Sequence, residues 1–72
     1  MDKLVLVAMV VNDESSGYYG ILDSSVVPAS QLETEDTAVL AWVATAQPGD
    51  FFRHPDYRRP DHHTLYVCVR HA

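Results

Sequence analysis

Residues 3–11 constrain the fold of this chain more than any other segment of the sequence. They read KLVLVAMVV and are followed by a turn-forming run at residues 12–17, a pattern typical of a buried β-strand. Both faces of this strand are apolar, whereas a sheet with one solvated face alternates apolar and polar residues. The chain must therefore cover both faces or leave one for a partner. One face would carry Leu4, Leu6, Ala8 and Val10, and the other Val5, Val7, Met9 and Val11.

Two further segments predict strands. Residues 18–22 follow the turn and predict a shorter strand, which would form an antiparallel hairpin with the first. Residues 26–28 predict an extended connector, because the residue before a proline is pushed out of helical space. Residues 64–70 read TLYVCVR and alternate between two faces, which predicts a final strand.

One helix is predicted between these strands. Ser30 and Glu33 fit the capping-box pattern, with Thr34 as a second candidate cap. The apolar body at residues 38–46 is polar only at Thr45, whereas a surface helix carries a single apolar stripe. The order strand, strand, helix, strand predicts an α+β fold. In that fold one helix packs on a small antiparallel-type sheet of about three strands.

The chain is predicted to form a single small domain over residues 1–72, with an irregular loop at about 48–63. A domain of 72 residues buries only about 60% of its unfolded surface, so its own core gives marginal stability. The surplus of apolar surface leaves three alternatives. The loop folds back as a lid, a second copy packs on the surface, or a different protein does.

The net charge of −5 is unevenly distributed along the sequence. Residues 1–50 hold eight acidic residues and one lysine, whereas residues 51–72 hold four arginines, two aspartates and all four histidines. An acidic body repels phosphate backbones. We therefore expect no direct nucleic-acid partner, but another protein with a basic surface. The residues predicted to attract it are Glu33, Glu35, Asp36, Asp13 and Glu14.

The predicted loop collects residue types that are enriched at protein-binding hot spots. Arginines and aromatic residues also contact nucleic acids, but the neighbouring Asp56 and Asp61 weaken that interpretation. The residues predicted to bind a partner protein are Phe51, Phe52, Arg53, Tyr57, Arg58 and Arg59.

No metal, cofactor or catalytic group is expected. His54, His62 and His63 are weak candidates for zinc binding, since adjacent histidines point apart in an extended chain and no Cys-x-x-Cys or His-x-x-x-His pattern accompanies them. Cys68 lies in a predicted strand, where packing is the usual role of a cysteine. The sequence lacks a glycine-rich phosphate loop, and we expect a protein that is not an enzyme.

The apolar run at residues 3–11 is too short to cross a bilayer, which takes about 20 residues, and it lacks a signal-peptide pattern. With a single cysteine, the chain is predicted to be cytoplasmic and to have no membrane partner.

The leading hypothesis is a small acidic protein-binding module. It would act as an inhibitor that covers a basic or nucleic-acid-binding surface of its partner. Small acidic proteins of phages and mobile elements, anti-CRISPR proteins among them, work in this way as a class, and size and charge alone motivate the comparison. The alternatives are a homodimeric structural or assembly subunit and a His-rich metal-binding module.

Overall fold

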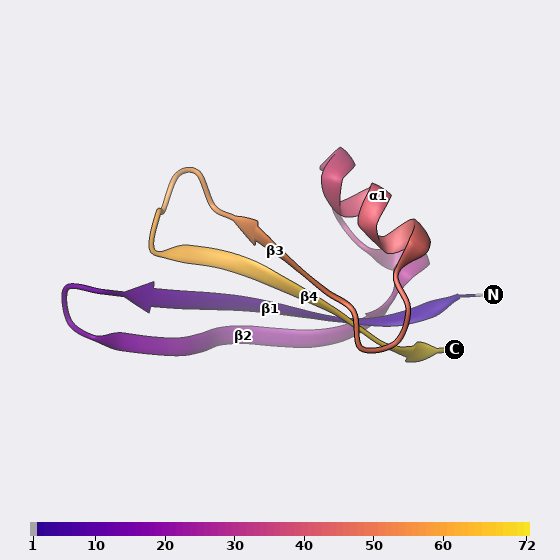
Figure 1. Cartoon of the computed structure of the whole chain (residues 1–72), viewed down its shortest axis with the longest axis horizontal. Helices are drawn as coiled ribbons and strands as arrows, with labels where there is room; N and C mark the ends of the chain where they lie inside the picture. The colour runs from indigo at the N-terminus through magenta and orange to yellow at the C-terminus, as the bar shows by residue number, and fades with distance from the viewer. Residues whose placement is uncertain (1) are drawn as a thin grey trace.

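The computed structural model describes residues 2–72, which form one antiparallel sheet and one α-helix (Figure 1). The strands lie in the order β2-β1-β4-β3, and each neighbouring pair is antiparallel. β1 is central, as its two apolar faces lead one to expect. The elements are β1 (Lys3–Asp13), β2 (Tyr18–Pro28), the 3-10 helix η1 (Ala29–Gln31), α1 (Thr37–Thr45), β3 (Phe51–Pro55) and β4 (His62–His71).

The prediction of an α+β fold with one antiparallel sheet is confirmed, but residues 2–72 contain four strands rather than about three. The additional strand is β3, which lies within the segment predicted to be an irregular loop. Gly49 has a positive φ of 95° and turns the chain back. Its N–H donates to the carbonyl of Cys68 at 2.8 Å, and the Cys68 N–H donates to the carbonyl of Asp50 at 2.9 Å. These bonds align β3 against β4.

The second strand is also longer than predicted, because it continues past Leu22 to Pro28. The Asp-Ser-Ser run at residues 23–25 reads as a turn, yet Ser24 pairs with Ala8 and Ser25 with Val7. Along this strand the register shifts between Met9 and Val10, and Leu22 is the extra residue of a bulge. The long β1 therefore offers backbone partners that override the local turn preference.

The N-cap of the helix lies six residues after Ser30, the first residue of the predicted capping box. Asp36 is its N-cap, and its carboxylate accepts hydrogen bonds from the backbone N–H groups of Ala38 and Val39. Ser30 instead donates to the carboxylate of Asp2 at 2.7 Å, which ties η1 to the start of β1. Glu33 therefore lies in the connector before α1 and not in its first turn.

The core lies between α1 and one face of the sheet. Its buried centre is Val5, Val39 and Tyr66. The ring of Trp42 lies 5.9 Å from that of Phe52 and 6.3 Å from that of Tyr66, within the range of favourable aromatic pairs.

The outer side of the helix explains its apolar composition. Ala38, Ala41 and Ala44 are exposed, and alanine is favoured there by helix propensity rather than by burial. None of the helices in residues 2–72 has the length and apolar character needed to span a membrane.

Candidate protein-binding surface

The face of the sheet opposite α1 is built mainly from apolar side chains. Successive residues of a strand point to opposite faces, and the strand register aligns one set on the face away from the core. Within residues 2–72, the α-helix packs on the other face. We call this surface the open face. Its positions are Leu4, Leu6, Ala8, Val10, Asn12, Tyr19, Ile21, Ser24, Val26, Pro28, Phe51, Arg53, Pro55, His63, Leu65, Val67 and Arg70. Ala8 and Val10 are buried, at 2% exposed each, so the other side chains form its accessible part.

One row of the open face crosses all four strands. Phe51 pairs with Val67, Val67 with Leu6, and Leu6 with Val26. Phe51 is 69% exposed and Val26 is 54% exposed, while the two central members are half-buried. Two rows further along β1, Ile21 is 62% exposed. These side chains form an apolar patch of the kind that marks interaction sites.

The molecule exposes more surface than its size requires. Its accessible area is 5039 Å², whereas a compact monomer of this mass exposes about 4,500 Å². The dimensions of 43 × 20 × 17 Å reflect the extended sheet. The excess reflects a long sheet on which the nine-residue helix covers only one end of one face (Figure 1).

The open face carries positive charge on a protein that is acidic overall. Arg53 and Arg70 belong to it, and among the described residues assigned to this face there is no aspartate or glutamate. None of the ten acidic residues of the chain occupies a position of this face, and Glu14 and Asp61 approach it only at the end next to the β1–β2 turn.

The acidic residues predicted to bind a partner do not form one patch. Asp13 and Glu14 lie at the β1–β2 turn, at the opposite end of the molecule from α1 (Figure 1). Hydrogen bonds from Ser15 and Ser16 lower the pKa of Asp13. The residues Glu33, Glu35 and Asp36 lie in the connector that leads into α1.

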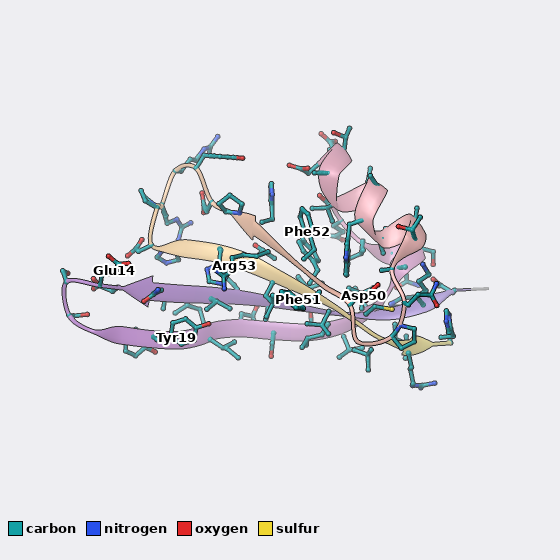
Figure 2. All side chains as sticks on the ribbon, viewed as in Figure 1. Glu14, Tyr19, Asp50, Phe51, Phe52 and Arg53 are labelled. Atoms are coloured by element: carbon teal, nitrogen blue, oxygen red, sulfur yellow. The ribbon has the colours of Figure 1, made fainter. Side chains whose placement is uncertain are left out.

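The predicted loop residues are divided between several surfaces. Phe52 points towards α1, whereas Phe51 and Arg53 extend over the sheet (Figure 2). Tyr57 is 85% exposed in the turn between β3 and β4, together with Arg58 and Arg59. The segment is therefore not a lid over the second apolar face, because it extends the sheet at its edge.

The histidines considered as zinc ligands are also separated. The Nε2 atom of His54 lies 2.9 Å from Oδ2 of Asp36, and Nδ1 of His62 lies 2.8 Å from Oδ1 of Asp61. His63 faces the open side, where burial and the nearby Arg53 lower its pKa. Within residues 2–72, no group of three or more His, Cys, Asp or Glu side chains is placed to hold a metal ion. Cys68 is 0% exposed.

A hollow of about 440 Å³ lies where the open face meets the β1–β2 turn. Sequence reasoning did not identify it, because its walls come from four separate segments. Successive residues of a strand point to opposite faces, so one of Tyr18 and Tyr19 must lie on the open face. This is the one signal in the sequence that points to the hollow. The lining residues are Asn12, Glu14, Tyr19, Arg53, Pro55, Pro60, Asp61, His62 and His63.

The fold and this surface together define a small α+β protein whose helix packs on one face of an antiparallel sheet, at the end away from the β1–β2 turn (Figure 1). In comparisons with protein-family models, curated proteins and solved structures, the chain matches none of them.

Proposed function

We propose that this protein is a non-enzymatic protein-binding module that docks through the open face. The observation that carries the proposal is the row Phe51, Val67, Leu6 and Val26, which runs across the sheet on the side away from α1. Burial of such a row removes apolar area from water, at about 25 cal/mol per Å². Phe51 and the two arginines are of the residue types that anchor interfaces.

The partner that fits is a different protein with an apolar surface that carries carboxylates. A second copy stacked on the open face would bring Arg53 and Arg70 against a surface that also carries these two arginines and, among the described residues assigned to it, no carboxylate. Like charges opposed across an interface cost several kcal/mol. Charge complementarity therefore favours an occupant other than the chain itself.

Pairing of two copies along β2 is also disfavoured. This edge strand carries the bulge at Leu22, the charge of Asp23 and the terminal Pro28. Bulges, charges and prolines are the features by which natural sheet edges resist pairing. Docking on the open face leaves this edge unchanged.

The acidic β1–β2 turn would act at the rim of the docking surface, because Glu14 lines the hollow at that end, where a basic part of the partner would meet it. The acidic connector before α1 lies on the opposite side, since Glu33 lies beside Val7, Ser25 and Val27 of the helix-side face. Rim charges change the association rate more than the affinity. By covering a surface that the partner uses for another purpose, the module would act as an inhibitor.

Site-specific photo-crosslinking in cells of the source organism tests this proposal. A photoreactive phenylalanine analogue replaces Phe51, and the matched control places it at Leu40, which is 44% exposed on α1. We expect a discrete crosslinked protein from position 51 and none from position 40. The captured protein is then identified, purified and titrated with the chain by calorimetry.

The titration uses two variants. Phe51→Ala should weaken binding at least tenfold, because loss of an aromatic anchor costs more than about 1.4 kcal/mol. Leu40→Ala should bind as the native chain does. Equal crosslinking at both positions, a second copy of the chain as the captured protein, or unchanged affinity for Phe51→Ala would each refute the proposal.

A further inference from the structure

The hollow beside the β1–β2 turn contains an arginine without a partner of its own. Arg53 extends from the edge strand β3 over the open face (Figure 2). Among residues 2–72, its guanidinium lies within 4.0 Å of no carboxylate. A guanidinium carries five N–H donors in a planar fork that matches the two oxygens of a carboxylate.

We infer that this hollow receives a carboxylate of the partner protein, carried by an aspartate or glutamate side chain next to apolar residues. The inference rests on the proposed function and adds the chemistry of the contact. Tyr19, Pro55 and Pro60 supply apolar wall area beside Arg53. The hollow therefore suits a carboxylate that is attached to an apolar group.

The other titratable groups of the hollow determine which anions bind there. His63 is neutral near pH 7, because burial and Arg53 lower its pKa below the usual 6.5, so Arg53 is left as the positive group that attracts the carboxylate. Asp61 is engaged by His62 at 2.8 Å. Glu14 belongs to the β1–β2 turn and lies nearer the end of the molecule than Arg53 does (Figure 2).

These neighbours disfavour a more highly charged ligand. A phosphate monoester carries close to two negative charges at neutral pH, so Glu14 and Asp61 repel it more strongly than they repel a single carboxylate. The same reasoning gives Glu14 a defined effect, since removing its charge should strengthen carboxylate binding.

The experiment is a nuclear magnetic resonance titration of the ¹⁵N-labelled chain with sodium benzoate, and with benzamide as the neutral ligand of matched shape. We expect saturable shifts at Tyr19, His63 and the Arg53 side-chain N–H with benzoate. Benzamide should give shifts at least about tenfold weaker in apparent affinity, since charged hydrogen bonds contribute about 1.5–3 kcal/mol.

Three variants assign the contact to this arginine. Arg53→Gln should weaken benzoate binding about tenfold, whereas Glu14→Gln should strengthen it about two- to threefold, as expected for a like charge at the surface. Arg70→Gln, which removes the other arginine of the open face, is the matched control and should leave the affinity unchanged. Equal binding of benzamide, or equal weakening by the two arginine variants, would overturn the inference.

The outcome is separable from that of the proposed function. If benzoate binds as expected but position 51 captures no partner, carboxylate binding in the hollow is supported and the docking proposal fails. If a partner binds through Phe51 and Arg53→Gln leaves its affinity unchanged, the docking proposal stands and this inference fails.

Discussion

The carboxylate of Asp36 connects the helix to the edge strand through His54. Its Oδ1 atom accepts the N–H of Ala38 at 2.8 Å, and its Oδ2 atom lies 2.9 Å from Nε2 of His54 on β3. One side chain therefore both begins α1 and holds β3 beside it. Both side chains are partly exposed, at 24% for His54 and 36% for Asp36.

Replacing Asp36 by alanine, which removes the cap, should destabilise the fold more than replacing it by asparagine, which removes only the charge. Asp36→Ala should lower the free energy of unfolding by about 1 kcal/mol, the usual cost of losing an N-cap. Asp36→Asn should lower the free energy of unfolding by less, because asparagine is as good an N-cap residue as aspartate. Urea unfolding followed by circular dichroism measures the difference. Equal losses for the two variants would show that the cap contributes nothing.

The coupling between Asp36 and His54 should be small. A double-mutant cycle with Asp36→Asn and His54→Ala should give about 0.2–1 kcal/mol, because the pair is partly solvated. A value near zero would mean that the apolar core, with Val39, Trp42 and Phe52, holds α1 and β3 together without help from this pair.

The thiol of Cys68 should report on opening of the core. It is 0% exposed and lies 4.0 Å from the carbonyl oxygen of Ala46, so a thiol reagent should react only when the sheet and helix separate. Val39→Ala should cost about 2 kcal/mol and raise the labelling rate about 30-fold. Leu40→Ala, at a neighbouring position of the same helix, is the control. Rapid labelling of the native chain would contradict the burial of Cys68.

The isolated chain should be a monomer at micromolar concentration. The opposed arginines disfavour stacking of two open faces, and the bulge, Asp23 and Pro28 protect the β2 edge. Light scattering after size-exclusion chromatography should give a mass near 8.1 kDa. Twice that mass would show that a second copy covers the open face and would favour the homodimer hypothesis.

Stability should fall as the pH drops below the ordinary histidine pKa of 6.5, with His63 as a contributor. Burial and Arg53 lower the pKa of His63 in the folded state, so the unfolded chain binds the proton more strongly. The loss starts below the unfolded pKa and ends below the folded one. The charged groups lining the same hollow are Arg53, Glu14 and Asp61.

The corresponding measurement is the urea midpoint at a series of pH values for the native chain and for His63→Gln. The urea midpoint of His63→Gln should fall less below pH 6.5 than that of the native chain. Identical pH profiles would assign the decline to other groups.

Local sequence patterns determined the general architecture. The apolar run at residues 3–11 indicated a central strand, since both of its faces had to be buried or bound, and the alanine- and valine-rich run at residues 38–46 indicated the helix. The predicted start of the helix was less accurate, because a side chain that could cap the helix can form a different hydrogen bond instead. Ser30 satisfies a cap pattern, but its hydroxyl bonds to Asp2, and Asp36 takes the cap.

The candidate surface was only partly predictable. The sequence placed Leu6 on one of two apolar faces without indicating which of them the helix covers. It singled out Phe51 and Arg53, but it gave no reason to separate them from Phe52 or Tyr57. That separation arises from β3, because alternate residues of a strand point to opposite faces. Tyr19 and Pro60 were not identified, since nothing local indicates that they line a hollow with Arg53.

The sequence by itself determined which segments are apolar, how their side chains alternate and where the charge lies along the chain. The tertiary structure decided which of those residues share a surface. Strand pairing joined Phe51, Val67, Leu6 and Val26 into one row and kept the acidic residues off it. The physical reason is that pairing register depends on backbone hydrogen bonds between distant segments, whereas periodicity reports only on a side chain's near neighbours.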